Sequence, residues 1–519
     1  STLFTYGSRG QLLDFTSGGR GYTVTYDSLH RPETKTSSAG FAEKRVYDDF
    51  GRLWKVLDGS GNVLVENVYD AVTGNLAQRK YGNGTSESYA FDTQGRLVQI
   101  AVRRGGTELE KLSYVYDADG KCIRMETSAG TNDYDYDLDG QLVHADYDDG
   151  TSEDFAYDAN GVRADLPEGV TFDDEGRLVE QGGAAGRMKC AYDAFGRLCG
   201  VTNAARGIAW SCAYDAFGNR VRVNENGRVT ERVYLPGTNK LLDEYEDGVC
   251  VRHHVWVGDC RVAVVGTGGI RYLHADLLGS VRLVTDGSGA ETGRAAFRAF
   301  GEKRGATGAD ANLCGWVAAF GVETDASGLH YMRHRYYSTE LRSFISEDPL
   351  GIGSGETNLR RYCFNDPIMN IDPLGLKVTK CDWLRWGNRA LSVVGGGLAI
   401  AGLVSTAPAL AVAGAVVGVT SIGLSLWREN SCGDEYSTAD KVKDVLSLGL
   451  GVCGFFKAVD TTSKVYKTST AIDGVRSGYD GATETPNIVR DARNLSAATV
   501  MQNSRWGNFK TDDELLDSL

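Results

Sequence analysis

The stretch Tyr47-Asp48-Asp49-Phe50-Gly51-Arg52-Leu53 carries the pattern that decides the fold, because its aromatic–Asp pair recurs at a regular spacing. The same pair, usually followed closely by glycine, occurs at Tyr26-Asp27, Tyr47-Asp48, Tyr69-Asp70, Phe91-Asp92, Tyr116-Asp117, Tyr136-Asp137, Tyr157-Asp158, Phe172-Asp173, Tyr192-Asp193 and Tyr214-Asp215. The mean step between successive aspartates, (215 − 27)/9, is about 21 residues. A fixed period of this length indicates a repeat architecture.

The chemistry of one unit predicts its local structure. Asp48 suits the first position of a type I turn, where its carboxylate accepts backbone N–H groups. Gly51 suits the positive-φ position that directs the chain into the next strand. A second glycine precedes most pairs by about eight residues, at Gly40, Gly61, Gly84, Gly130, Gly150, Gly186 and Gly207. Two turns per repeat predict one β-hairpin per repeat, and successive hairpins are expected to stack into a continuous sheet. The repeat aspartates are therefore interpreted as turn residues rather than as calcium ligands or catalytic acids.

The composition agrees with this interpretation and excludes several classes of protein. A chain of 519 residues is too long for one compact core. Its 66 glycines, 8 prolines and 25 tyrosines favour many short strands. A net charge of −14 argues against binding of nucleic acid by the whole chain. Eleven scattered cysteines without a CxxC pair indicate neither a zinc site nor a disulfide framework, so we predict no metal and no cofactor. The first residues lack a signal pattern and a starting Met, which predicts a fragment and leaves the export route open.

Three stretches carry a resemblance to a known family. Residues 192–198 read Tyr-Asp-x-x-Gly-Arg-Leu, residues 272–280 contain an H-x-D-x-L-G-S segment, and residues 315–337 are similar to the run that precedes the RHS core signature. Over residues 1–376 the chain thus resembles bacterial RHS/YD-repeat proteins, which are related to the C components of toxin complexes and to teneurins. The resemblance implies a mainly β fold, in which a spiral of hairpins forms a shell-like sheet around a toxic C-terminal domain. We accordingly expect YD repeats in 1–235, an RHS core region in 236–376 and a variable domain in 377–519.

The core region ends with two Asp-Pro-Leu-Gly units, at 348–351 and 372–375. In the resembled family an aspartate pair cuts the chain after Asp-Pro-x-Gly-Leu. Carried over, this makes Asp348 and Asp372 the catalytic pair, Arg333 the supporting cation with Arg335 as the alternative, and Leu376–Lys377 the scissile bond. Two adjacent carboxylates can share one proton and act as base and acid, while an arginine stabilises the ionised member or the developing oxyanion.

One turn in this region departs from the family pattern. The family typically reads Tyr-Tyr-Asp-Pro-x-x-Gly-Arg-Phe, whereas residues 336–344 read Tyr-Tyr-Ser-Thr-Glu-Leu-Arg-Ser-Phe. Both the Asp-Pro pair and the glycine are replaced. We therefore expect a different strand–turn geometry at Ser338–Arg342.

Composition changes abruptly after Leu376. Residues 390–427 contain 38 residues without a charge, interrupted by Pro408, and each half is close to the minimum length of a membrane-spanning helix. The sequence predicts a mainly α C-terminal domain with a hydrophobic helical hairpin that inserts into a membrane, or, alternatively, is buried within a soluble cargo domain. No histidine follows His334, and residues 377–519 contain fifteen Lys/Arg and fifteen Asp/Glu. This disfavours His-dependent nucleases, His-dependent hydrolases, His-ligated zinc deaminases and nucleic-acid partners.

These features lead to one leading hypothesis and two alternatives. The leading hypothesis is a secreted or cell-surface bacterial polymorphic toxin that encloses its own C-terminal domain and releases it by a single-turnover self-cleavage. The resemblance further implies a cognate immunity protein and a secretion machinery as partners. The alternatives are a wall-associated adhesion protein and an effector whose tail is an unrecognised enzyme.

Overall fold

The computed structural model describes residues 2–163, 167, 169–182, 186–351, 357–376 and 379–380. All of them belong to the first of two compact units, Ser1–Ala399, and the second unit, Ile400–Leu519, lies outside the described residues. The predicted helical domain and its hydrophobic hairpin at 390–427 also lie outside them. Within the described ranges, no helix is long and apolar enough to cross a membrane.

Two long antiparallel sheets confirm the prediction of a mainly β fold. In each sheet every strand pairs with the next strand in sequence. The first sheet contains β1 (Thr2–Tyr6), β2 (Leu12–Ser17), β3 (Arg20–Tyr26), β4 (Pro32–Ser37), β5 (Ala42–Tyr47), β6 (Leu53–Asp58), β7 (Val63–Tyr69), β8 (Leu76–Tyr81), β9 (Thr85–Phe91), β10 (Leu97–Arg104), β11 (Thr107–Tyr116), β12 (Cys122–Glu126), β13 (Thr131–Tyr136), β14 (Leu142–Asp146) and β15 (Ser152–Asp154).

The second sheet continues the pattern and runs without a break across the expected domain boundary at residue 235. It contains β16 (Val170–Phe172), β17 (Leu178–Gln181), β18 (Met188–Tyr192), β19 (Leu198–Asn203), β20 (Ile208–Tyr214), β21 (Arg220–Glu225), β22 (Arg228–Tyr234), β23 (Leu241–Glu246), β24 (Val249–Val257), β25 (Cys260–Gly266), β26 (Gly269–Ala275), β27 (Val281–Asp286), β28 (Glu291–Phe297) and β29 (Lys303–Thr307). The boundary at 235 is thus a change of sequence motif within one sheet.

Two small sheets follow and carry the candidate site. The first consists of β30 (Glu323–Thr324), β31 (His330–Met332), β32 (Arg335–Ser338) and β33 (Ser343–Phe344), and the second of β34 (Asn370–Ile371) and β35 (Thr379–Lys380). Among the described residues, the connections contain the short 3-10 helices η1 (Ala204–Arg206), η2 (Ala318–Phe320) and η4 (Cys363–Asn365).

The repeat turn has the predicted chemistry. Asp48 Oδ1 accepts the N–H groups of Phe50 (3.0 Å) and Arg52 (2.8 Å), and Gly51 has φ of 79°. Asp48 Oδ2 accepts Arg52 Nε at 2.7 Å. The Arg52 guanidinium also lies 4.3 Å from the ring centre of Tyr69, the aromatic residue of the next repeat. The interpretation of these aspartates as turn residues is confirmed.

The hydroxyl group of the repeat tyrosine explains why tyrosine outnumbers phenylalanine at this position. Tyr47 donates to the carbonyl of Pro32 at 2.7 Å, and Tyr116 donates to the carbonyl of Leu97 at 2.6 Å. Each acceptor is the first residue of the neighbouring strand, β4 beside β5 and β10 beside β11. The hydroxyl therefore adds a side-chain hydrogen bond to the backbone ladder that joins these strands.

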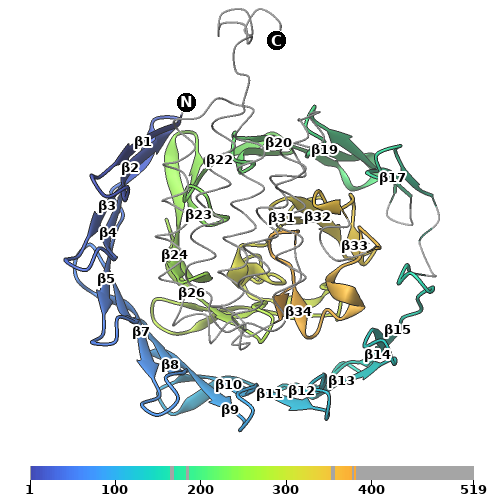
Figure 1. The fold of residues 1–519 in the computed structure, drawn as a ribbon, viewed down its shortest axis with the longest axis horizontal. Helices are drawn as coiled ribbons and strands as arrows, with labels where there is room; N and C mark the ends of the chain where they lie inside the picture. The colour runs from blue at the N-terminus through green and yellow to red at the C-terminus, as the bar shows by residue number, and fades with distance from the viewer. Residues whose placement is uncertain are drawn as a thin grey trace, which may run out of the picture. The chain divides into compact units, whose positions relative to one another are not determined.

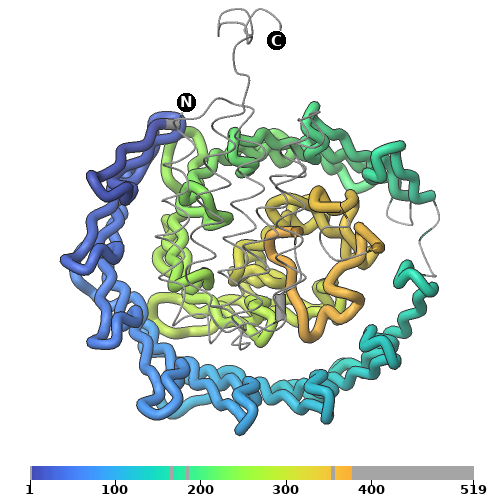
Figure 2. The backbone as a smooth tube through the Cα atoms, in the orientation of Figure 1, coloured from blue at the N-terminus to red at the C-terminus, as the bar shows by residue number. Residues whose placement is uncertain are grey.

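The two sheets pack against each other in chain order. Hydrogen bonds join Tyr22 to His253, Glu87 to His274, and Tyr147 to Ala299, so the sequence separation falls from 231 to 187 and then to 152 residues. Fewer residues of the second sheet thus cover the same length of the first. Figures 1 and 2 show the first sheet following a curve, with β22–β26 on its inner side, where the path is shorter. The largest apolar cluster draws on both sheets and on the β30–β33 hairpins, which places the candidate site against this core.

Candidate functional site

Both Asp-Pro-Leu-Gly units fold as the turn of the repeats. Asp348 Oδ1 accepts the N–H of Leu350 at 2.8 Å, and Gly351 has φ of 56°. Asp372 Oδ1 accepts the N–H of Leu376 at 3.0 Å, and Gly375 has φ of 64°. The two candidate catalytic aspartates therefore have a structural role in their own turns, as the aspartates of the repeats do.

The difference from the repeats lies at the second carboxylate oxygen. In five repeat turns this oxygen pairs with an arginine four residues later: Asp27–Arg31, Asp48–Arg52, Asp92–Arg96, Asp173–Arg177 and Asp193–Arg197. In the Asp-Pro-Leu-Gly units this position is Ile352 or Leu376. Instead, one nitrogen of Arg335 lies 3.1 Å from Asp348 Oδ2 and 3.2 Å from Asp372 Oδ2. Asp348 and Asp372 thus share one arginine, whereas the aspartate of each of these five repeat turns pairs with an arginine of its own.

Three further contacts hold Arg335 between the carboxylates. Its Nε donates to the carbonyl of Gly375 at 2.7 Å, and one terminal nitrogen donates to the carbonyl of Leu359 at 2.9 Å. Its guanidinium carbon lies 3.5 Å from the ring centre of Phe344, within cation–π range. Because the guanidinium is bound on its edges and on one face, its direction is set before any reaction begins.

Arg335 and the two aspartates are buried, and burial changes the pKa values of these charged groups. Arg335, Asp348 and Asp372 are 5%, 7% and 1% exposed. Burial raises the pKa of Asp348, and the charge of Arg335 opposes that rise. Burial also lowers the pKa of Arg335, but a guanidinium remains protonated in proteins. Two carboxylates with one cation leave one negative charge in excess, which favours the binding of one proton by the pair.

The structure places Arg333 away from this pair and corrects the order of the two arginine candidates. Arg333 has φ of 57° in the two-residue turn between β31 and β32. Its guanidinium donates to the backbone carbonyls of Thr238 and Phe217, the latter at 3.0 Å. Arg335 is the first residue of β32, and the strand directs its side chain toward the aspartates. Residues in hairpin turns point differently from residues in the following strand, and this boundary is the signal that would have favoured Arg335.

The altered turn at Ser338–Arg342 nevertheless closes the hairpin of β32 and β33. Ser338 Oγ accepts the N–H of Leu341 at 3.2 Å and takes the place of the aspartate. Arg342 has φ of 53° and takes the place of the glycine. Ser338 pairs with Ser343, so the strand pairing around the site is kept despite the different turn residues.

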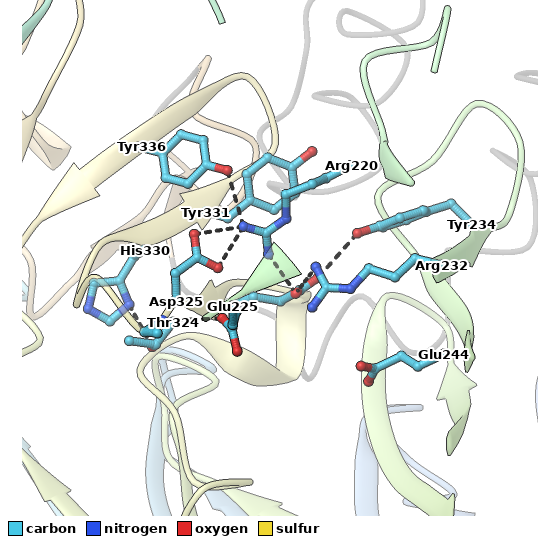
Figure 3. Close-up of polar contacts among 12 residues, drawn as sticks. Arg220, Glu225, Arg232, Tyr234, Glu244, Thr324, Asp325, His330, Tyr331 and Tyr336 are labelled. Carbon is cyan, nitrogen blue, oxygen red and sulfur yellow. Dashed lines mark hydrogen bonds and ion pairs between the residues drawn. The ribbon is translucent and has the colours of Figure 1, made fainter. Parts of the chain in front are cut away.

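A buried ionic group fixes the strand that carries Arg335 to the second sheet (Figure 3). Arg220 in β21 is fully buried, and its guanidinium lies 2.6 Å from Asp325 and 2.8 Å from Glu323. It also donates to the hydroxyl of Tyr336 at 3.1 Å. Because Tyr336 follows Arg335 directly in β32, this contact holds the strand in place.

The predicted scissile bond follows the second turn. Leu376 is partly buried and bound to Asp372 through its N–H, whereas Lys377 lies outside the described residues. The chain then returns antiparallel to itself, since Ile371 pairs with Thr379. The described residues on either side of the bond, Leu376 and Thr379, are thus held close to Ile371 and Asp372.

Within the described ranges, no group of three or more His, Cys, Asp or Glu side chains is arranged to hold a metal ion. The H-x-D-x-L-G-S segment joins separate parts of the fold. His274 bonds Glu87 at 2.7 Å, the N–H of Leu277 donates to Tyr114 at 3.0 Å, and Ser280 Oγ accepts the N–H of Val317 at 3.1 Å. The segment therefore connects β26–β27 to the first sheet and to the loop that precedes the site.

Comparison with known proteins shows which proteins the chain is similar to. No protein-family model matches the chain. The probable deoxyribonuclease RhsA of Dickeya dadantii is 26% identical over 407 residues, which cover 75% of this chain and 26% of RhsA. Toxin subunit YenC1 of Yersinia entomophaga is 25% identical over 449 residues, which cover 66% of this chain and 46% of YenC1. The chain is similar to toxin-related RHS-repeat proteins. It spans less than half the length of either relative.

A solved structure supports the fold independently. The crystal structure of TcdB2-TccC3 without its hypervariable C-terminal region superimposes with a TM-score of 0.59 at 19% identity. The match covers 72% of this chain and 23% of the solved chain. At this identity the likeness shows the shared hairpin architecture.

Proposed function

We propose that the chain belongs to a bacterial polymorphic toxin whose YD-repeat wall carries a C-terminal domain and releases it by cutting Leu376–Lys377. One observation carries the proposal: Arg335 joins Asp348 and Asp372, and Asp372 binds the N–H of Leu376. The name of YenC1, a toxin subunit, supports the assignment to this class.

The reaction is a hydrolysis in which the aspartate pair supplies both proton transfers. The ionised member takes a proton from water as the water oxygen bonds to the carbonyl carbon of Leu376. The protonated member gives its proton to the nitrogen of Lys377 as the C–N bond breaks. Asp348 is assigned the proton because burial raises its pKa. The bond and the pair belong to one chain, so proximity accelerates this single turnover.

The experiment is expression of the chain followed by intact-mass measurement. A fragment that begins at Lys377 is expected from the wild type and from Arg333→Met, the matched control. Asp348→Asn, Asp372→Asn and Arg335→Met should remain full length. A wild type that is indistinguishable from Asp348→Asn refutes the proposal.

For the released domain we propose membrane perturbation, based on the uncharged residues 390–427. The nuclease activity named for RhsA is not carried over, because residues 377–519 contain no histidine and no excess of basic residues. We further propose a secreted or cell-surface location, with an immunity protein and a secretion machinery as partners. Adhesion at the cell surface and an enzymatic tail are the competing functions.

Induction of residues 377–519 inside bacteria separates these functions. Rapid loss of membrane potential supports a membrane-active domain, whereas nucleic-acid damage or loss of translation supports an enzyme. Unchanged growth, membrane potential and nucleic acid contradict both and favour adhesion.

A further inference from the structure

Arg342 occupies a backbone conformation that favours glycine. Its φ is 53°, where a side chain other than glycine is strained, and in the resembled family a glycine stands at this place. The strain does not prevent formation of the β32–β33 hairpin. A strained residue beside a candidate site suggests that its side chain has a use there.

The side chain of Arg342 reaches the last strand of the first sheet. Its guanidinium donates to Glu153 of β15 at 2.9 Å and lies 4.5 Å from the ring centre of Phe155. The two charged side chains are 17% and 14% exposed, so the ion pair is largely shielded from water. Residues 189 positions apart in sequence are thereby joined.

Glu153 itself is held by other parts of the first unit. Its Oε2 accepts the hydroxyl of Tyr147 at 2.5 Å and lies 3.9 Å from Arg298, which follows β28. The position of Glu153 therefore depends on the end of the first sheet and on its packing against the second sheet.

The hairpin connects Arg342 to the aspartate pair over a short distance. Phe344 lies two residues after Arg342, pairs with Tyr337 across the hairpin and contacts the guanidinium of Arg335 with its ring. A displacement of Arg342 therefore moves the ring that supports the shared cation.

We propose that Glu153 and Arg342 are positioning residues that couple docking of β15, the end of the first sheet, to self-cleavage. The hairpin holds Arg335 between the aspartates only when Glu153 is in place, so the chain is cut after the first sheet is complete. This inference rests on the proposed cleavage, and it predicts a dependence of the cleavage rate on a residue far from the scissile bond.

Arg342→Gly is the most informative variant, because it removes the guanidinium and relieves the backbone strain. We expect it and Glu153→Gln to slow the appearance of the fragment that begins at Lys377 about tenfold, as loss of a shielded charge-assisted hydrogen bond implies. The exchanged pair Glu153→Arg with Arg342→Glu should recover part of the rate. Glu340→Gln, an exposed charge in the same turn, should cleave as the wild type does. A wild-type rate in Arg342→Gly or Glu153→Gln overturns the proposal, as does an exchanged pair that is slower than both single variants.

Hydrogen exchange in the Asp348→Asn background separates this proposal from the cleavage proposal. Phe344 N–H donates to the carbonyl of Arg360 at 2.9 Å, and Ile345 N–H donates to that of Tyr336 at 2.9 Å. Added Arg342→Gly should speed the exchange of both amides while the melting temperature stays unchanged. Unchanged exchange refutes the coupling even if the wild type proves unable to cleave, whereas faster exchange in a non-cleaving chain refutes the cleavage alone.

Discussion

Replacement of Arg335 by methionine removes the cation that joins Asp348 to Asp372 and leaves two buried carboxylates without it. At an effective dielectric constant of about 20, each contact of 3.1 or 3.2 Å corresponds to roughly 5 kcal/mol of attraction. Removal of one partner from a buried ion pair typically costs about 3–5 kcal/mol after relaxation. If only about 3 kcal/mol of this appears in the barrier, cleavage slows by about a hundredfold.

The pH dependence of cleavage gives a second, more specific readout. The active pair carries one proton, so the rate should follow a bell-shaped curve bounded by the two pKa values of the pair. A cation favours ionised carboxylates, so its removal raises both pKa values. The curve of Arg335→Met should therefore move toward higher pH, by one unit or more.

Intact-mass time courses at pH 4 to 9 measure both effects, with Arg333→Met as the control. Arg333 carries the same charge two residues away, but its guanidinium donates to the backbone carbonyls of Thr238 and Phe217. A pH curve that does not move in Arg335→Met, or that moves equally in Arg333→Met, would show that the pair does not depend on Arg335.

Three further predictions concern stability and turn geometry. Burial raises the pKa of Asp276 to about 6, so its contribution to the unfolding free energy is present below about pH 4 and is lost as the pH rises through 6. The unfolding free energy of Asp276→Asn, measured relative to that of the wild type, should therefore increase by up to roughly 3 kcal/mol between pH 4 and 7.5; an equal difference at both pH values contradicts this. Gly375→Ala would place a Cβ 2.7 Å from the carbonyl oxygen of Met332 and should abolish cleavage by intact mass, whereas Gly351→Ala, which is strained at φ of 56° but meets no described atom within 4 Å, should slow cleavage less; equal rates in the two variants would contradict this. Tyr116→Phe loses the hydrogen bond to the preceding repeat and should lower the unfolding free energy in urea by about 1 kcal/mol; no loss would deny this bond a role.

Local interactions explain why much of the fold could be predicted. The turn of each repeat is completed within five residues, from the Asp48 carboxylate to Arg52, so its residue types reveal it directly. The spacing of these turns then determines the length of the strands. The two Asp-Pro-Leu-Gly turns obey the same rule, whereas the pairing of Asp348 with Asp372 came from the resemblance to the RHS/YD-repeat family.

Non-local contacts explain the parts that could not be predicted. Arg333 and Arg335 have the same charge and are separated by one residue, and only the end of the β31–β32 turn distinguishes their directions. Glu153 supports the β32–β33 hairpin through its contact with Arg342, which is 189 residues away in sequence. No repeat or motif spacing in the sequence predicts this contact.

The sequence by itself determined the repeat, its turns and the positions of the two aspartates, because each depends on hydrogen bonds between close neighbours in the chain. The tertiary structure alone decided that these aspartates share one arginine. That arrangement requires β32 and two distant turns to meet in a buried place, where a carboxylate without a nearby cation favours its protonated form.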